Sequence, residues 1–412
     1  MKLDVEFVRS LFPAFACQPT KNWAFFENAG GSYVCRQVVD RLHAFMTEYK
    51  AQPYGPSWMA QHAGEAMDAG YAAVAGMLNA RRESLTLGPS TTANLYVLAH
   101  ALRPGLAAGD EIVVTNQDHE ANVGCWRRLE EFGVVIREWR VDEAGELPTD
   151  ELETLVGPRT RVVCFSLSSN IVATQNPVAK IVAIAKRHGA LVVGDAVSFA
   201  PHWIPDAEAC GVDFLLFSTY KTFATHLGVM WGSDEGLAKT KGQGHYFNET
   251  KPNYRLNPTG PLHAEIGSLA GLAEYVDELY GYHFSESEGS LRRRTEAVFG
   301  LIKEHEIELT RRLLAKLAEL PGLHVVGRGT EAMETRSSVV SIRSDRVAPA
   351  ELARRLAQRE IAVGAGHFYA ARLLDALGID LERGVLRVSM VHYNTFDEID
   401  RLTEALGEIV VA

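Results

Sequence analysis

Five short apolar runs lie between residues 111 and 218, at 111–116, 134–139, 161–167, 190–196 and 214–218. Runs of this length without polar alternation are typical of strands that are covered on both faces. Segments with apolar residues at helical spacing separate them, such as residues 178–188, which end at Gly189. Alternating strands and helices require crossover connections, so the pattern predicts an α/β fold with a mainly parallel sheet covered by helices.

The pattern changes near residue 285. Residues 287–320 predict a long, charged amphipathic helix, and strands are expected at 324–326, 338–342 and 385–391, with a helix at 349–359 and another at the end. Thr395 and Glu398 have the spacing of a capping box before that last helix. We therefore expect an N-terminal arm at 1–20, a large domain at 21–285 and a smaller α+β domain at 286–412.

Composition narrows the function classes. The formal net charge of -11 argues against nucleic acid or an anionic membrane as the main partner. Five scattered cysteines without a CxxC pair argue against a zinc site and fit a reduced protein, so we expect no metal and a cytoplasmic location. The chain shows no signal-type apolar segment and no apolar run of about 18 residues, so no membrane insertion is expected.

Polar residues that follow the apolar runs are the first candidates for chemistry, because ligands of open parallel sheets bind beyond the carboxyl ends of the strands. They are His119, Asn170, Asp195 and Lys221. This set suits pyridoxal 5'-phosphate (PLP): the lysine can form a Schiff base with the aldehyde, and the carboxylate can keep the pyridine nitrogen protonated. The imidazole can stack on the ring, and the amide can bind the ring hydroxyl.

A phosphate site is predicted by the segment GPSTTAN at residues 88–94. It supplies a glycine turn and three hydroxyls, on Ser90, Thr91 and Thr92, directly before a helical run, which is how a helix N-terminus is prepared for an anion. Ser218, at the end of another predicted strand, adds a fourth hydroxyl. The predicted cofactor is therefore held at both ends.

Taken together, these motifs resemble those of the class V aminotransferases and cysteine desulfurases, which are fold-type-I PLP enzymes, and most closely the branch called cysteine-desulfurase-like. The matching stretches, in chain order, are FFENAGGS (25–32), GPSTTAN (88–94), QDHEAN (117–122), SNIVATQNPV (169–178), GDAVSFAPH (194–202), STYK (218–221) and LRVSMVHYNT (386–395). The resemblance covers nearly the whole chain. It implies a large domain with a seven-stranded sheet, an amino-acid substrate and a homodimer with sites at the interface.

The resemblance also implies a role for each matching residue. Lys221 is expected to be the catalytic Schiff-base lysine, Asp195 the partner of the pyridine nitrogen and His119 the stacking imidazole, while Arg387 would bind the substrate carboxylate through two parallel hydrogen bonds. The residues expected to complete the cofactor site are Ser90, Thr91, Thr92, Asn170, Ser198 and Ser218, with Thr259 reaching the phosphate of the partner subunit. Further substrate contacts are expected at Asn28, Ala29, Gly30, His226, His367 and Tyr369.

The chain also departs from the family pattern. Cysteine desulfurases carry a nucleophilic cysteine on a loop that corresponds to residues 364–370, yet no cysteine follows Cys210. Tyr220 replaces the histidine before the lysine, and Ser198 replaces a glutamine. Persulfide formation by the usual route is therefore disfavoured, since it needs a thiolate.

Three hypotheses follow: an aminotransferase, a carbon–sulfur β-lyase without a nucleophilic cysteine, and a non-catalytic dimeric scaffold. Individual residues also have plainer interpretations. Lys221 could be a surface lysine, Arg387 could form an ion pair between domains, and Tyr369, His367 and His226 could be a packed aromatic and surface histidines.

Overall fold

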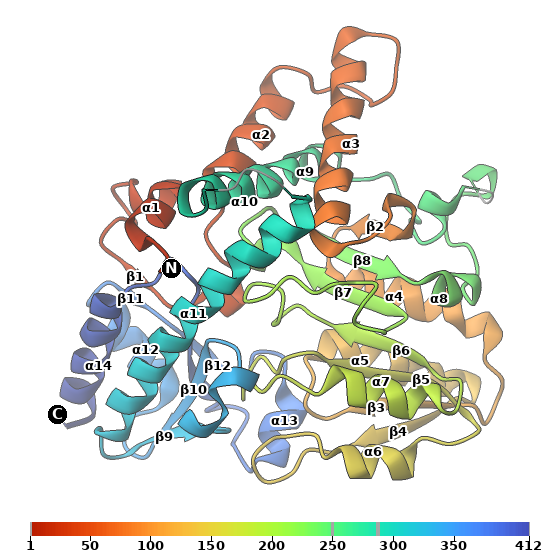
Figure 1. Ribbon diagram of the computed structural model, residues 1–412. Coiled ribbons are helices and arrows are strands. Elements are labelled where there is room, and N and C mark those ends of the chain that lie inside the picture. Colours follow the sequence, from red (N-terminus) through yellow and green to blue (C-terminus); the bar gives the residue numbers. More distant parts are fainter. Residues whose placement is uncertain (1, 249–250, 286–288, 412) are drawn as a thin grey trace.

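The computed structural model describes residues 2–248, 251–285 and 289–411. Its centre is a seven-stranded sheet with the order β2-β8-β7-β6-β5-β3-β4 (Figure 1). Every neighbouring pair is parallel except those made by β8, which runs antiparallel to β2 and β7. The expected mainly parallel, seven-stranded sheet is thus confirmed. Its strands are β2 (Leu85–Gly88), β3 (Glu111–Thr115), β4 (Val135–Trp139), β5 (Thr160–Ser166), β6 (Leu191–Asp195), β7 (Phe214–Ser218) and β8 (Gly228–Gly232).

The five predicted apolar runs correspond to β3 to β7. All residues of β3, β6 and β7 are buried, as expected for strands covered on both faces. In β5 only Arg161 is exposed, whereas β4 exposes Val135 and Arg137 because it forms one edge of the sheet. The other edge, β2, and its neighbour β8 were not among the predicted runs.

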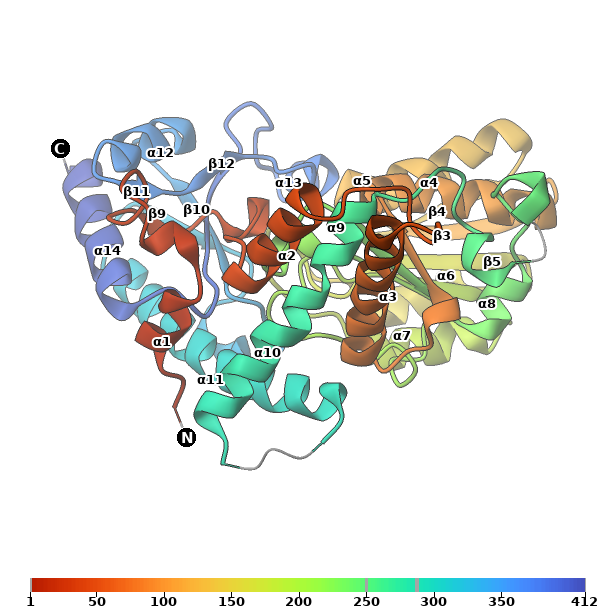
Figure 2. The ribbon, with the colours of Figure 1, turned by 90° about the horizontal axis from the view of Figure 1, so that it is seen from above.

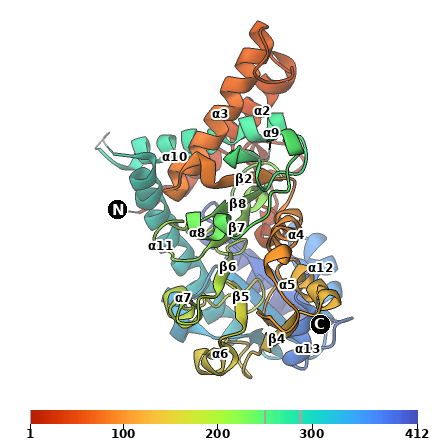
Figure 3. The same cartoon turned by 90° about the vertical axis from the view of Figure 1, so that its right-hand side faces the viewer.

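Helices cover both faces of this sheet. Residues Ile112 and Val114 of β3 pack in one core with α4 and α5, whereas Val113 points into the opposite core with α7. This alternation follows from the two-residue repeat of a strand. Figure 3 shows α4 and α5 on one side of the sheet and α7 and α11 on the other. The helices of this region are α4 (Thr91–Leu102), α5 (Glu120–Arg127), α6 (Thr149–Leu155), α7 (Val178–Lys186) and α8 (Asp234–Ala238).

A second helical group stands out from the body of the molecule. It consists of α2 (Arg36–Thr47), α3 (Trp58–Leu78), α9 (His263–Ser268) and α10 (Ala270–His283), and Figures 1 and 2 show the last two lying against α2 and α3. Close approach of α3 and α9 depends on Gly70, because a Cβ there would lie 1.9 Å from the carbonyl oxygen of Ile266. The projecting end of this group carries exposed apolar side chains, including those of Met46, Tyr54 and Trp58.

The C-terminal part contains a four-stranded antiparallel sheet with the order β12-β13-β10-β9. Near the N-terminus, β1 pairs with β11 in parallel. The strands are β1 (Ala24–Phe25), β9 (Leu323–Val326), β10 (Val339–Ser344), β11 (Ile361–Ala362), β12 (Gly364–Gly366) and β13 (Val385–Ser389). The helices are α1 (Val5–Ser10), α11 (Leu291–Ala318), α12 (Pro349–Ala357), α13 (Ala371–Ala376) and α14 (Phe396–Val411).

Local signals explain where these helices begin. The long helix expected from residue 287 starts at Leu291, where the side chain of Ser290 caps it by accepting a hydrogen bond from the Arg293 backbone; residues 286–288 lie outside the described residues. The capping box is confirmed, because Thr395 Oγ1 accepts from the Glu398 backbone N–H at 3.1 Å and Glu398 accepts from that of Thr395 at 3.0 Å. The domain boundaries at residues 20 and 285 stay predictions. Over the ranges described, no helix has the length and hydropathy needed to cross a membrane.

Candidate active site

A cavity of about 100 Å³ opens where β5, β6 and β7 end. These strands finish with Ser166, Asp195 and Ser218, and all three residues line it. The cavity brings together ten of the residues singled out from the sequence, namely Ser90, Thr91, Thr92, His119, Asn170, Asp195, Ser198, Ser218, Lys221 and His226. The carboxyl edge of the parallel sheet is therefore where the candidate chemistry gathers.

Lys221 lies in a 3₁₀ turn, Thr219–Lys221, that directly follows β7. Its side chain is buried, and its Nζ atom makes no hydrogen bond or ion pair with any residue that the structure describes. Burial, assisted by the positive charge of Arg387, lowers the pKa of this lysine to about 7. The amine is therefore largely neutral at slightly alkaline pH, which is the state that attacks an aldehyde.

Asp195 ends β6 and is buried beside Lys221. One carboxylate oxygen accepts a hydrogen bond from the backbone N–H of Val197 at 2.8 Å. Burial raises the pKa of Asp195 to about 7, and the nearby carboxyl of Asp118 acts in the same direction. Ionising this buried carboxyl is therefore costly. A positive group placed against it, such as a protonated pyridine nitrogen, would stabilise its ionised form.

His119 caps the N-terminus of α5. Its Nδ1 accepts a hydrogen bond from the backbone N–H of Ala121 at 3.0 Å, so the neutral ring carries its proton on Nε2. Burial, together with the charges of Lys221 and Arg387, lowers the pKa of His119 to about 4. A neutral imidazole at this wall of the cavity is suited to stacking on a flat ring.

The residues of the predicted phosphate site lie together at the N-terminus of α4. Ser90 caps this helix by accepting from the Ala93 backbone at 3.1 Å, and the hydroxyls of Thr91 and Ser218 lie 2.7 Å apart. A Cβ at Gly228 would lie 2.3 Å from the carbonyl carbon of Ser90, so β8 can support this loop only through a glycine. Backbone N–H groups and hydroxyls at a helix start bind anions well. These residues fit PLP: the start of α4 would hold its phosphate, Asp195 would pair with its pyridine nitrogen and Lys221 would react with its aldehyde.

Arg387 projects from β13 and is almost fully buried. No carboxylate of the described chain forms an ion pair with it, so the expected alternative of an ion pair between domains is not found there. One guanidinium nitrogen donates to the carbonyl oxygen of Asn170 at 3.3 Å. Burial lowers the pKa of Arg387 to about 10, so it remains charged at neutral pH. The carboxylate of Glu27 raises this pKa without forming an ion pair, and Arg387 is not among the residues that line the cavity of Lys221. A buried, charged guanidinium without an ion-pair partner in the described chain is suited to bind a carboxylate.

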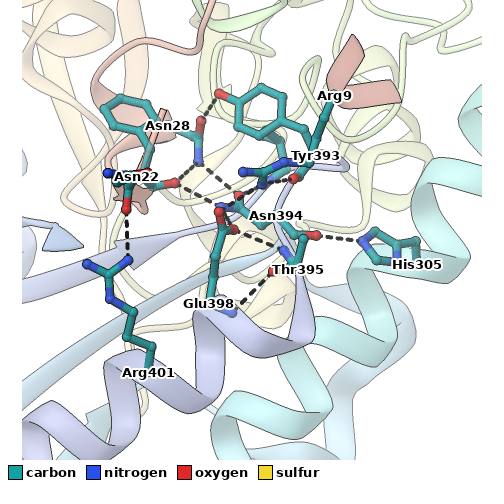
Figure 4. Close-up of polar contacts among 11 residues, drawn as sticks. Arg9, Asn22, Asn28, His305, Tyr393, Asn394, Thr395, Glu398 and Arg401 are labelled. Carbon is teal, nitrogen blue, oxygen red and sulfur yellow. Dashed lines mark hydrogen bonds and ion pairs between the residues drawn. The ribbon is translucent and has the colours of Figure 1, made fainter. Parts of the chain in front are cut away.

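Two residues of the segment at 25–32 lie close to Lys221. Asn28 and Ala29 share a cavity of about 10 Å³ with Lys221 and Ser198, whereas Gly30 is not among the residues that line it. The Asn28 side chain is already engaged: its Nδ2 donates to the carbonyl oxygen of Ser389 at 2.7 Å, and its Oδ1 accepts from the Tyr393 hydroxyl (Figure 4). In this structure Asn28 joins the N-terminal segment to the end of β13, and its substrate contact stays a prediction.

Of the other predicted residues, His226 lines the cavity, whereas Tyr369, His367 and Thr259 are exposed and do not. The rings of His226 and Tyr220 stack at 4.5 Å, and the ring of Tyr369 lies 5.0 Å from that of His119. His367 is exposed and accepts from the Tyr369 backbone at 3.1 Å. Thr259 is exposed and lines neither cavity, so its contact with a partner subunit also stays a prediction.

Two residues of the site were not singled out from the sequence. Phe368 packs its ring 3.7 Å from the guanidinium carbon of Arg387, and its carbonyl oxygen accepts from Asn170 Nδ2 at 3.0 Å. Asp118 is buried and holds the start of α5 by accepting from Asn122 Nδ2 at 2.7 Å. The position of Asp118 between β3 and His119 offered a signal, whereas Phe368 reaches the site only through tertiary packing.

None of the five cysteines lines the cavity that contains Lys221. Cys35, Cys125 and Cys164 are buried elsewhere, and burial raises the pKa of both Cys35 and Cys125 to about 12. Thiols in that state are poor nucleophiles. The site therefore lacks a cysteine that could accept sulfur.

Comparisons with known proteins identify the family of this chain and several of its relatives. The family model for aminotransferase class-V matches residues 24–402. The chain is 32% identical to the aminotransferase-like protein FGM3 of Gibberella zeae over 99% of this chain and 98% of that protein. It is 30% identical to a probable cysteine desulfurase of Mycolicibacterium paratuberculosis, over 98% of this chain but only 58% of that longer relative.

Among solved structures, the apo cysteine desulfurase of Thermococcus onnurineus NA1 has a similar fold, with a TM-score of 0.86 and 23% identity over 100% of this chain and 99% of the other. A second similar structure, described as a C-DES mutant with glycine covalently linked to the PLP cofactor, gives a TM-score of 0.76 at 18% identity over 97% of this chain and 99% of the other. At these low sequence identities, the similarity to both structures shows a shared fold alone. Because the family model matches most of the chain and a relative aligns over nearly its full length, the chain belongs to the class V aminotransferase family of PLP-dependent enzymes.

Proposed function

We propose that this protein is an aminotransferase that acts on an α-amino acid. The observation that carries the proposal is the buried guanidinium of Arg387, which has no ion-pair partner among the described residues and acts on the pKa values of both Lys221 and His119. A carboxylate bound there would satisfy an otherwise costly charge and would place the α-carbon of the amino acid near the lysine.

The residues around the cavity supply binding and proton transfer, while PLP, when bound, supplies the electron sink for the α-carbon. Lys221 is the group that takes the α-proton and returns it, because its pKa of about 7 leaves a large share of the amine neutral at physiological pH and it has no competing hydrogen bond in the described chain. Asp195 holds the pyridine nitrogen, and Thr91 and Ser218 hold the phosphate. Arg387 orients the substrate through its carboxylate.

A β-lyase acting on a sulfur-containing amino acid is the second candidate. It is favoured by the position of Tyr369, whose ring lies 5.0 Å from His119 and whose side chain is 67% exposed at the mouth of the site. A phenol there could assist a leaving group. The absence of a cysteine from the cavity disfavours desulfuration through an enzyme persulfide, but it leaves elimination open.

A homodimer is part of the proposal. The projecting end formed by α2 and α3 exposes Met46, Tyr54, Trp58 and Met59, and contiguous apolar side chains of this kind are typical of protein interfaces. Thr259 is exposed as well, which leaves it accessible to a partner subunit. Light scattering that gives the mass of one chain at micromolar concentration would contradict this part of the proposal.

One experiment separates the candidate functions. The purified protein is mixed with PLP and then with single amino acids, while the cofactor spectrum and the product masses are followed. Transamination leaves the cofactor in its amine form and releases a 2-oxo acid, whereas β-elimination releases ammonia and pyruvate. A protein that stays colourless with added PLP would instead be a scaffold, and the proposal would be wrong.

A further inference from the structure

A buried imidazole–carboxylate pair, His202 with Glu306, lies outside the roles described so far. His202 belongs to the segment that follows β6, Glu306 belongs to α11, and His202 Nδ1 lies 2.6 Å from Glu306 Oε2. The two side chains are only 9% and 4% exposed. The second carboxylate oxygen, Glu306 Oε1, is buried without a hydrogen-bond partner in the described chain. A buried carboxylate oxygen in this state is costly and calls for a functional explanation.

The pair lies between two cavities. His202 and Lys221 both line the cavity of about 10 Å³, which is close to the smallest space that holds one water molecule. His202 and Glu306 both line a second cavity of about 210 Å³, which holds several waters. The imidazole is therefore the side chain common to the small space at the catalytic lysine and the larger space beside α11.

We propose that His202 and Glu306 form a proton relay between Lys221 and the larger cavity. The inference rests on the proposed function, in which Lys221 must change its protonation state. In the outward direction an N–H bond of the Lys221 ammonium breaks, and one water in the small cavity passes the proton to His202 Nε2. The proton on His202 Nδ1 moves to Glu306, and water in the larger cavity takes it up. His202 is neutral throughout: it starts with its proton on Nδ1 and ends with one on Nε2, and return of a proton along the same path restores the first tautomer. One proton crosses, and no electrons are transferred.

Polar side chains line the larger cavity and can hold the water that takes up the proton. The hydroxyls of Thr310 and Ser338 line the same space and can orient water beside the carboxylate.

The alternative is a purely structural contact that joins α11 to the segment after β6. Both explanations predict that the loss of His202 lowers the melting temperature, because Glu306 Oε2 would be left buried without its hydrogen-bond partner. Only the relay predicts a change in how fast Lys221 gives up a proton. The test must therefore measure a proton-dependent rate that involves Lys221 in a folded protein.

The reaction to follow is the attachment of PLP to the apoprotein at pH 6, read from the absorbance of the lysine-bound cofactor in a stopped-flow instrument. At this pH a proton must leave Lys221 before the bond forms. We expect His202→Gln and Glu306→Gln each to slow attachment by about tenfold or more, within the lower part of the range for positioned acid–base groups. We also expect the ratio of rates in H₂O and D₂O to differ from that of the parent protein.

Imidazole provides a second readout. The variant His202→Ala lacks the imidazole ring, which enlarges the connection between the two cavities. Added imidazole should restore PLP attachment in this variant, at a rate that rises with the imidazole concentration. A purely structural role of His202 would not produce this rescue. The matched control is His324→Gln, since His324 makes a similar imidazole–carboxylate pair with Asp345 at 3.0 Å on the surface. This control should attach PLP at the parent rate. If His202→Gln fails to fold, Glu306→Gln retains a hydrogen-bonding side chain and keeps the test decisive.

The relay is overturned if folded His202→Gln or Glu306→Gln attaches PLP at the parent rate with the parent isotope effect. It is also overturned if imidazole has no effect on a slowed His202→Ala. Failure of the proposed function looks different, because the parent protein itself would then bind no PLP or leave every amino acid unchanged.

Discussion

The guanidinium carbon of Arg387 lies 3.7 Å from the centre of the Phe368 ring, and Phe368 has a left-handed backbone conformation with φ of 49°. Gly364 makes room for that ring, since a Cβ there would lie 2.8 Å from it. Stacking covers one face of the guanidinium, and one of its nitrogens donates to the Asn170 carbonyl oxygen, which leaves the other N–H groups for a ligand. The loop that carries Phe368 thus packs against the guanidinium that we propose binds the substrate carboxylate.

Replacing Arg387 with lysine should raise KM for the amino-acid substrate. Lysine keeps the positive charge but cannot make two parallel hydrogen bonds or stack on Phe368. Loss of one hydrogen bond to a charged group costs about 1.5–3 kcal/mol, so kcat/KM should fall roughly 10- to 100-fold. Binding of PLP should be unchanged. In the control Arg383→Lys, which alters an exposed arginine shortly before β13, kcat/KM should stay within about twofold.

The glycine beneath the phosphate loop gives a second prediction. In Gly228→Ala the new Cβ would lie 2.5 Å from the backbone nitrogen of Thr91, so the loop or β8 must move. Overpacking of this kind costs about 1–3 kcal/mol. We expect the affinity for PLP to fall about tenfold or more, with a smaller loss for pyridoxal, which has no phosphate. Absorbance titrations of the apoprotein measure both affinities.

Gly157 is the matched control, because a Cβ at that position has no heavy atom within 4 Å and its backbone is not left-handed. Gly157→Ala should bind PLP like the parent protein. Equal losses of PLP and pyridoxal affinity in Gly228→Ala would show that the glycine supports the sheet in general and not the phosphate loop.

The parts of the fold that could be predicted are those in which one physical signal dominates. Residues 214–218 are apolar without interruption, and β7 is indeed buried throughout. Gly189 has φ of 72° just after α7, which agrees with its predicted role as a helix stop. Short β2 was missed because its four residues, Leu85–Gly88, include a threonine and a glycine and depend on pairing with β8.

In the candidate site, too, some contacts could be predicted from the sequence and others could not. Asp195, Ser218 and Lys221 follow strands, so their meeting at one sheet edge could be predicted from the order of the elements. The contact of Arg387 with Phe368 and the bond from Tyr393 to Asn28 could not, because these partners are brought together by packing between segments distant in the chain. No local pattern encodes such contacts.

Tyr369 separates transamination from elimination. If the reaction is a transamination, Tyr369→Phe should change kcat by less than about threefold, since the phenol is exposed and has no assigned proton transfer. If the phenol assists a leaving group, the loss should be about 10²-fold or more. Steady-state rates with the best substrate of the amino-acid series provide the measurement. We expect the small change.

The burial of Lys221 should be visible in the stability of the apoprotein. The pKa of this lysine is lowered from 10.5 to about 7 by burial, so the unfolded chain binds more protons than the folded one between these pH values. The free energy of unfolding therefore rises with pH across this window, and the full penalty of the buried charge is present below about pH 7. Lys221→Met removes the penalty, because methionine has a similar volume and no charge.

At pH 6 we expect apo Lys221→Met to be more stable than the parent apoprotein by roughly 1–4 kcal/mol, and the difference should shrink toward zero as the pH approaches 10. Urea unfolding at several pH values measures it. The same variant should lose covalent attachment of PLP, so stability and function change in opposite directions. A pH-independent difference would mean that the charged form of Lys221 carries no energetic penalty in the folded protein. It would then remove the physical basis for a lysine pKa as low as about 7.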